Sequence, residues 1–356
     1  MEAKKQLIRE SHGGDIYRGR RILADFSVNV NPLGVQPEVI AAVREAAARI
    51  SCYPDMHCEE LTDALAGFEQ VPSEYLICTN GAAELFYGAV LALKPKKALL
   101  LSPTFSEYER ALKIVGVSVH YYVLKEMESF RVTEDFLEYI TPDMDMVFLC
   151  NPNNPTGQSI PKELAERIAG RCRECGSFLV IDECFVDFLD SPSRCSMKER
   201  LGCYPGLLIA KALTKLFSMP GLRLGYGMCS DRDFLCRMRD TLQSWNVSVL
   251  AQVGGAAAVK HCGGYLAETK KLIGRERAYL IGAFEESDFK IYGSEANYLF
   301  FRDFAGEERE LYQMALDAGF LIRDCSDYRG LCRGYYRIAV RTRPENERMV
   351  AWLRQL

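Results

Sequence analysis

Four short polar segments follow apolar, strand-like runs, and their side chains could carry out chemistry together. Residues 80–83 (NGAA) open a helical run, where free backbone amides and small side chains suit a bound anion. The loop at residues 151–157 (NPNNPTG) offers further amides, and Asp182 follows the run FLVI with an acid. Lys215 stands shortly after the run LLIA. Desolvation and nearby cations can remove the proton of such a lysine and leave an amine nucleophile.

Each segment also has an ordinary structural explanation when it is considered alone. A helix start can bind only water, a proline-rich loop can be a rigid turn, an acid after a strand can cap a helix, and a lysine can lie on the surface. Ligands of parallel α/β sheets, however, gather at the carboxyl ends of the strands, where all four segments fall. A pyridine aldehyde phosphate needs this combination of an amine, a phosphate cradle, an acid opposite the ring nitrogen and an amide donor.

Three motifs, NPNNPTG, IDECF and LTKLFSMPGLRLGYG, resemble in order and spacing those of the fold-type-I, pyridoxal-phosphate-dependent enzymes of the class I/II aminotransferase superfamily. The resemblance covers nearly the whole chain and implies pyridoxal 5'-phosphate as the cofactor. It implies that Lys215 forms the Schiff base and that Asp182 keeps the ring nitrogen protonated. The other cofactor contacts that it implies are Asn154 to the ring hydroxyl, Phe105 against the ring face, and Thr214, Arg223 and the amides of Ala82 and Ala83 to the phosphate.

The same resemblance implies a homodimer with shared active sites. Tyr53, in the segment CYPD, matches a tyrosine that reaches the cofactor phosphate of the partner subunit. Arg337, in YYRIAV, matches the arginine that grips the α-carboxylate of the substrate through two hydrogen bonds. Two positions depart from the common pattern: Ala212 replaces a Ser or Thr that contacts the phosphate, and Phe185 replaces a Tyr that bonds the ring hydroxyl. We therefore expect the hydroxyl to rely more on Asn154.

Within the superfamily, the chain resembles the threonine-phosphate decarboxylases and the histidinol-phosphate aminotransferases, which both act on phosphate-bearing substrates. The HGG segment at His12 and the run DFSVNVNPLG at 25–34 are similar to the decarboxylase group of cobalamin biosynthesis, in which Phe185 is expected. These motifs indicate decarboxylation of L-threonine O-3-phosphate to (R)-1-aminopropan-2-yl phosphate. The candidate contacts to the substrate phosphate are His12 and Arg323, and Asn31 is expected to line the substrate pocket.

The alternative is transamination of the histidinol-phosphate aminotransferase type. The bond at Cα that stands perpendicular to the cofactor ring is the one that breaks. A carboxylate in the ring plane therefore gives transamination, and an upright carboxylate gives decarboxylation. The same anion-holding groups serve either reaction, and the sequence does not fix their angles.

Composition argues against several other classes of protein. The 356 residues carry a formal net charge of −4, and nucleic acid binding needs a basic face. No apolar run reaches the ~20 residues of a membrane span, and no apolar segment of a secretory signal follows the start, so we expect a cytoplasmic enzyme. The 14 cysteines lack paired spacing and are expected to be reduced.

Two further alternatives find little support in the sequence. Cys172 and Cys175 form a C-x-x-C pair without a second pair or a nearby His, so we expect no metal site. Aminotransferase-like transcription regulators carry a DNA-binding helix-turn-helix, for which we expect no room before His12.

A sheet with intervening helices must position these motifs. Apolar runs predict strands at 75–79, 98–102, 117–124, 144–150, 178–182, 207–210 and 223–229, with a helix at 133–140 among the connections. Such strands indicate a mostly parallel sheet that is covered on both faces. The expected fold class is α/β, with a large domain of this kind and a smaller α+β domain. We expect an N-terminal segment at 1–45 that packs with the small domain, the large cofactor-binding domain at 46–255 and the small domain at 256–356.

Overall fold

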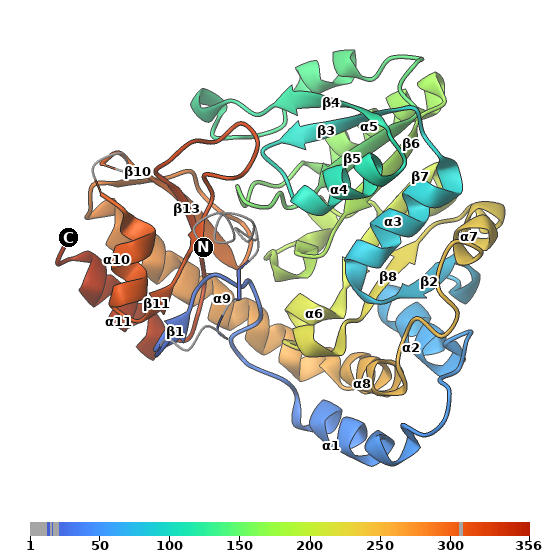
Figure 1. The fold of residues 1–356 in the computed structure, drawn as a ribbon, viewed down its shortest axis with the longest axis horizontal. Coiled ribbons are helices and arrows are strands. Elements are labelled where there is room, and N and C mark those ends of the chain that lie inside the picture. The colour runs from blue at the N-terminus through green and yellow to red at the C-terminus, as the bar shows by residue number, and fades with distance from the viewer. Residues whose placement is uncertain (1–12, 15, 17–20, 306–308) are drawn as a thin grey trace, which may run out of the picture.

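The computed structural model describes residues 13, 14, 16, 21–305 and 309–356, and His12 lies outside the described residues. Its largest sheet has the strand order β2-β8-β7-β6-β5-β3-β4 (Figure 1). The strands are β2 (Leu76–Thr79), β3 (Lys97–Ser102), β4 (Ser118–Val123), β5 (Met146–Cys150), β6 (Phe178–Asp182), β7 (Leu207–Ala212) and β8 (Gly225–Met228). β8 is antiparallel to β2 and β7, whereas the other pairs are parallel. The predicted α/β fold with a mostly parallel sheet is confirmed.

The central strands of this sheet are apolar along most of their length because both of their faces are covered, whereas the edge strand β4 is partly exposed. Every residue of β5 and β7 is buried. Successive side chains of a strand alternate between the faces: Leu99 and Leu101 join one buried cluster, and Ala98 and Leu100 join the other. Helices α3 (Gly81–Leu93), α4 (Ser106–Ile114) and α7 (Arg232–Arg239) contribute to the second cluster, and α2 (Glu59–Glu69), α5 (Lys162–Cys175) and α8 (Val249–Lys260) contribute to the first.

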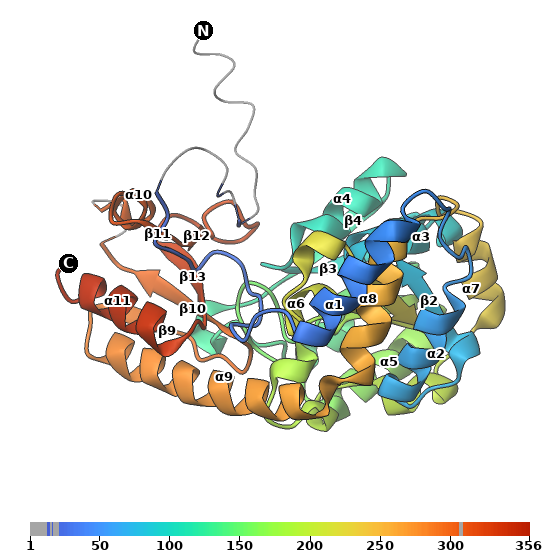
Figure 2. The ribbon, with the colours of Figure 1, turned by 90° about the horizontal axis from the view of Figure 1, so that it is seen from below.

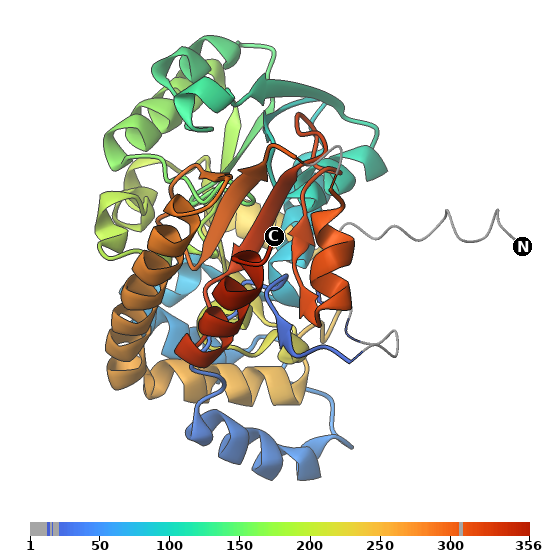
Figure 3. The ribbon, with the colours of Figure 1, turned by 90° about the vertical axis from the view of Figure 1, so that its left-hand side faces the viewer.

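A smaller antiparallel sheet lies among the C-terminal helices (Figure 3). Its strands are β12 (Arg323–Asp324), β13 (Tyr335–Ala339), β10 (Tyr298–Asp303) and β9 (Phe289–Ile291), in that spatial order. The helices of this part are α9 (Cys262–Glu285), α10 (Leu311–Asp317) and α11 (Arg343–Leu353). Figure 2 shows α9 as a long helix that runs from the side of α8 to the underside of the small sheet. α9 therefore connects the end of α8, which packs on the large sheet, with strands β9 and β10 of the small sheet.

The N-terminal segment contacts both parts of the molecule. β1 (Ala24–Asp25) pairs in parallel with β11 (Phe320–Leu321), close to the small sheet. α1 (Pro37–Ala46) instead packs along α8. The domain boundaries given above stay a prediction.

One expected element differs in type, and one strand runs against the rest of the mostly parallel sheet. The helix expected at 133–140 is a 3-10 helix at Glu134–Tyr139. β8 runs antiparallel to β7, and residues 213–224, which include the single-turn helix α6 (Leu213–Leu216), connect the two strands. No helix in the described ranges has the length and apolar character to cross a membrane.

Candidate active site

A cavity of about 410 Å³ lies where the carboxyl ends of β5, β6 and β7 face strands β12 and β13 of the small sheet. The predicted site residues that line it are Ala82, Ala83, Phe105, Asn154, Asp182, Thr214, Lys215, Arg223, Arg323 and Arg337. The strand ends thus bring together residues that are far apart in the sequence, as ligand sites of α/β sheets require.

Lys215 is held in this pocket by the one-turn helix α6 and by Asn31. The backbone N–H of Asn31 donates to the Lys215 carbonyl oxygen at 3.0 Å, and its side-chain Nδ2 donates to the Leu216 carbonyl oxygen at 2.8 Å. Burial is the largest cause that lowers the pKa of Lys215, and the positive charge of Arg337 is the next, so that the pKa falls from 10.5 to about 8. Lys215 therefore offers a neutral amine at a pH where an ordinary lysine is almost fully charged.

Asp182 ends β6 with its carboxylate in the pocket wall. Its Oδ2 accepts a hydrogen bond from the Tyr108 hydroxyl at 2.6 Å, and its Oδ1 accepts one from the Cys184 backbone N–H at 2.9 Å. Burial raises the pKa of Asp182, and these two hydrogen bonds oppose that shift. Tyr108 is itself fully buried and stacks on Phe148 with 5.3 Å between the ring centroids. The carboxylate is thus fixed in place and has lone pairs left for a cationic ligand group.

The start of α3 and the side chain of Arg223 form a cradle for an anion. Gly81 has a φ of +75°, and a Cβ there would lie 2.7 Å from Nη2 of Arg223. A Cβ at Gly225 would lie 2.4 Å from the backbone nitrogen of Ala82, so only glycine allows this approach. None of the acids in the described part of the chain pairs with Arg223. A helix N-terminus beside a cation suits a phosphate group.

Two arginines stand on the small-sheet wall. Arg323 and Arg337 are directly opposed in the antiparallel pair of β12 and β13. Arg337 donates through Nη2 to the Ser27 carbonyl oxygen at 2.8 Å and through Nη1 to Oδ1 of Asn154. Its buried Nε has no partner among the described residues, and neither has the buried Oδ1 of Asn29, another lining residue. An unpaired donor and an unpaired acceptor in one pocket wall indicate that a polar ligand satisfies them.

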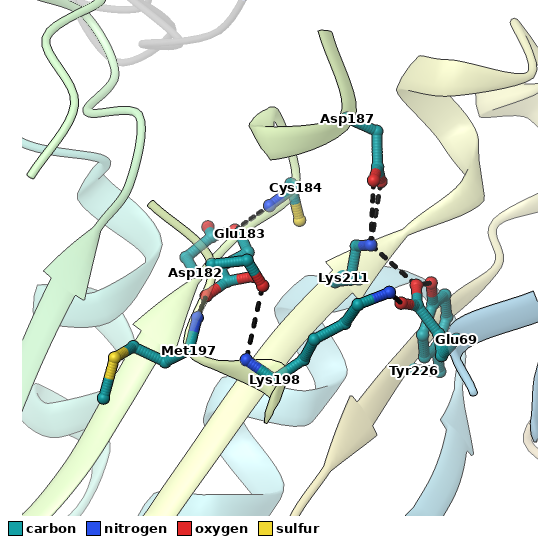
Figure 4. Close-up of polar contacts among 10 residues, drawn as sticks. Glu69, Asp182, Glu183, Cys184, Asp187, Met197, Lys198, Lys211 and Tyr226 are labelled. Atoms are coloured by element: carbon teal, nitrogen blue, oxygen red, sulfur yellow. Dashed lines mark hydrogen bonds and ion pairs between the residues drawn. The ribbon is translucent and has the colours of Figure 1, made fainter. Parts of the chain in front are cut away.

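A buried charge network supports the strand that leads to Lys215 (Figure 4). Lys211 of β7 pairs with Glu69 at 2.6 Å and with Asp187 at 2.8 Å, and the Tyr226 hydroxyl also donates to Glu69. Burial raises the pKa of Glu69, but the nearby lysine charges outweigh burial and lower it to about 2. The exposed fractions of the Lys211 and Glu69 side chains are only 4% and 1%. Both charges are compensated, so the network fixes β7 four residues before the pocket lysine.

Two predicted site residues, Asn31 and Tyr53, are not brought into this pocket, and a third lies outside the described residues. The side-chain Nδ2 of Asn31 donates to the Leu216 carbonyl oxygen and to the Thr269 hydroxyl, the latter at 2.7 Å. Asn31 therefore holds α6 and does not line the cavity. Tyr53 is 79% exposed and stacks on Trp245, with ring centroids 4.5 Å apart, outside the cavity. His12 lies outside the described residues.

The structure also adds residues that sequence reasoning missed, namely Ser27, Asn29, Tyr108 and Tyr328. The motif VNVN contains both Asn29 and Asn31, and nothing in its pattern shows which of the two meets the pocket. Tyr108 and Tyr328 act through partners far along the chain and leave no local signal. Ala212 and Phe185 do line the cavity, without polar groups, as the sequence departures required.

Comparison with known proteins agrees with this geometry. The family model for aminotransferase class I and II matches residues 21–353. The chain is 35% identical over 357 residues to the threonine-phosphate decarboxylase of Salmonella typhimurium, which covers 98% of this chain and 97% of that protein. It is 30% identical over 347 residues to the histidinol-phosphate aminotransferase of Moorella thermoacetica, which covers 95% of this chain and 86% of that protein. The crystal structure of the histidinol-phosphate aminotransferase from Clostridium acetobutylicum superposes with a TM-score of 0.87 at 28% identity, over 94% of this chain and 98% of that chain.

The chain therefore belongs to the class I and II aminotransferase family, and the resemblance expected from its motifs is confirmed. It is a pyridoxal-phosphate-dependent enzyme of that family. The pocket fits this cofactor because it combines a buried lysine of lowered pKa, a fixed carboxylate and a glycine-lined anion cradle.

Proposed function

We propose that this enzyme is a threonine-phosphate decarboxylase, which converts L-threonine O-3-phosphate to (R)-1-aminopropan-2-yl phosphate and CO2 in cobalamin biosynthesis. The second arginine of the small-sheet wall supports a phosphorylated substrate, and the identity to a threonine-phosphate decarboxylase is the observation that carries the choice of reaction. Arg337 can serve the α-carboxylate and Arg223 the cofactor phosphate, so Arg323 is a further cation in the same pocket. A phosphorylated substrate needs such a cation. The 35% identity to a threonine-phosphate decarboxylase over nearly the whole chain supports the same assignment.

We assign the cofactor contacts from the lining of the pocket. Pyridoxal 5'-phosphate, when bound, draws electrons away from the bond that breaks at the substrate Cα. Lys215 supplies the amine for its aldehyde, and Asp182 accepts from its ring nitrogen. Oδ1 of Asn154 already accepts from Arg337 and from the Tyr328 hydroxyl at 3.3 Å, which leaves Nδ2 for the ring hydroxyl. The remaining contacts are Phe105 against the ring and Ala82, Ala83, Thr214 and Arg223 at the phosphate.

Decarboxylation replaces a carboxylate on Cα with a proton, and the pocket residues divide this work. Arg337, with its unpaired Nε, and Asn29, with its unpaired amide oxygen, orient the polar groups of the substrate. Lys215 Nζ lies in the same pocket and can carry a proton near neutral pH because its pKa is about 8. We assign it the delivery of that proton to Cα after CO2 departs.

The rival function is transamination of histidinol phosphate, which the 30% identity to a histidinol-phosphate aminotransferase favours. The deciding experiment incubates the purified holoenzyme with threonine phosphate in the absence of any keto acid and measures CO2. Release of CO2 and of aminopropanol phosphate is the expected result. Formation of glutamate from histidinol phosphate and 2-oxoglutarate, without CO2 from threonine phosphate, would establish the rival instead.

Arg323→Ala is expected to raise the KM for threonine phosphate roughly ten- to a hundredfold, because one charge-assisted contact contributes about 1.5–3 kcal/mol. Unphosphorylated threonine lacks the phosphate that Arg323 contacts. It should bind poorly to both the parent and the variant, and its KM should differ little between them. Steady-state kinetics with both substrates measures the difference. Equal losses for the two substrates would remove Arg323 from phosphate recognition.

We also propose that the active unit is a homodimer. Tyr53 and Trp245 form an exposed aromatic stack beside Ile50, which is 72% exposed, and such a patch suits an interface. In a shared site, Tyr53 of one subunit serves the cofactor phosphate of the other. Mixing inactive Lys215→Ala with a Tyr53→Ala variant should therefore restore some activity through hybrid sites, up to about a quarter of the parent for random pairing. A monomer in sedimentation at working concentration would exclude this arrangement.

A further inference from the structure

Arg323 is held by Asp324 of its own strand and by Asp327 and Tyr328 of the segment that follows. Its Nη2 donates to both carboxylate oxygens of Asp327, at 2.8 and 2.9 Å, and its Nη1 donates to the Asp324 carbonyl oxygen. Its guanidinium carbon lies 5.1 Å from the centre of the Tyr328 ring. The side chain of Arg323 is 10% exposed and that of Asp327 38%, so the acid reaches the arginine from the solvent side. These bonds fix the orientation of the Arg323 guanidinium through its Nη1 and Nη2.

The pair of Arg323 and Asp327 lies beside a second buried cation of the small sheet, Arg337. Arg323 and Arg337 face each other across the antiparallel pair, where like charges destabilise the sheet. The bonds of Arg337 go to neutral oxygens of Ser27 and Asn154, so its charge is not cancelled. Asp327 supplies the counter-charge to Arg323 in the absence of a ligand. Removal of this acid would weaken the compensation of the Arg323 charge opposite Arg337.

Tyr328 connects this arrangement to the floor of the pocket. Its ring supports the guanidinium of Arg323, and its hydroxyl donates to Oδ1 of Asn154. The loop that carries Asp327 and Tyr328 is itself closed by the Tyr328 backbone N–H, which donates to the Cys325 carbonyl oxygen at 3.1 Å. Arg323 is therefore tied to the residue that we assign to the cofactor hydroxyl.

We propose that Asp327 is a positioning residue for substrate selection: it holds Arg323 in the orientation that meets the phosphate of the substrate. This inference rests on the proposed function, because it takes Arg323 as the phosphate contact. Asp327 does not touch the reacting atoms. Its effect should therefore fall on the binding of the phosphorylated end and not on the chemical step.

The test uses Asp327→Asn, which keeps the shape of the side chain and removes its charge, in the holoenzyme. We expect the KM for threonine phosphate to rise about tenfold, the value of one weakened charge-assisted contact, while kcat stays within about threefold. Asp327→Glu keeps the carboxylate and is expected to lie closer to the parent than to the Asn variant. The matched control is Glu286→Gln, which removes an acid from the exposed pair with Arg354, 2.8 Å apart and outside the cavity.

Each outcome separates this inference from the proposed function. If Arg323→Ala does not weaken threonine phosphate, the phosphate assignment of the proposed function fails. If Arg323→Ala weakens it but Asp327→Asn leaves KM unchanged, the positioning role alone is overturned. A lower KM in Asp327→Asn would also overturn it, since Asp327 would then only repel the phosphate. If Asp327→Asn lowers kcat by a factor as large as the rise in KM, or clearly lowers the melting temperature, the acid has a general structural role. The inference is then likewise overturned.

Discussion

Lys215→Ala is expected to lower turnover at least about a thousandfold and to abolish covalent attachment of the cofactor. The variant loses both the amine that binds the aldehyde and the group that carries the proton to Cα, and a general acid or base alone contributes about 10²–10⁴-fold. Borohydride reduction followed by peptide mass mapping measures attachment. Lys260→Ala, which removes an exposed lysine paired with Glu60, is the matched control and should behave like the parent. A reduced pyridoxyl group on another lysine of the Lys215 variant would refute the assignment.

The pH dependence of cofactor attachment gives a second measure of Lys215. The amine reacts only when it is deprotonated, so attachment to the cofactor-free protein should be slow below pH 8 and rise as the pH passes the lowered pKa of about 8. For a lysine with the ordinary pKa of 10.5, the rate of attachment would rise only near that pH. Since the charge of Arg337 contributes to the shift, after burial, Arg337→Gln should move this midpoint upward. A midpoint near 10 in the parent would contradict the electrostatic reading of the site.

Asp182→Asn is expected to bind the cofactor yet to lose turnover by about two to three orders of magnitude, the usual cost of a misplaced or missing electrostatic partner at a reacting group. A neutral amide of the same shape can still accept the hydrogen bond from the Tyr108 hydroxyl, but it has no charge to stabilise a proton on the ring nitrogen. The loss in cofactor affinity should be smaller, about ten- to a hundredfold, because one charge-assisted hydrogen bond is affected.

Cofactor titration by absorbance and the rate of CO2 release separate these two losses for Asp182→Asn. Asp190→Asn, at an exposed acid 3.5 Å from Arg277, controls for the chemical change. Turnover near that of the parent in Asp182→Asn would remove the carboxylate from the reaction.

The sequence predicted the central strands of the large sheet well because they are continuous apolar runs. The strand expected at 144–150 is β5 (Met146–Cys150), and the one expected at 178–182 is β6 in full. The direction of β8 could not be predicted, because a run that is buried on both faces has the same composition in either direction. The 3-10 geometry of Glu134–Tyr139 could not be predicted either, because in so short a segment the tighter winding leaves no distinct apolar pattern.

The centre of the site could be predicted, and its supports could not. Lys215 and Asp182 stand in motifs directly after strands, so their convergence follows from the sheet. Tyr108 reaches Asp182 across 74 positions of sequence, and such a contact leaves no local pattern. Asn29 was missed because only the fold decides which asparagine of VNVN meets the cavity. The role of Tyr53 stays a prediction, because it requires a second chain.

The charge network behind the pocket also constrains how this enzyme could change during evolution. Loss of Glu69 would leave the buried Lys211 with Asp187 as its ionic partner, and loss of Lys211 would leave the buried Glu69 with Lys198. Breaking a buried pair in this way costs up to about 3–5 kcal/mol, whereas exchange of the whole set for apolar residues of similar volume can be neutral. The network could therefore be replaced during evolution only if several of its residues changed together, because each protein with a partly replaced network would be less stable. Positions 69, 211 and 226 should accordingly be inherited and replaced as a group among related genes, although none of them lines the ligand cavity.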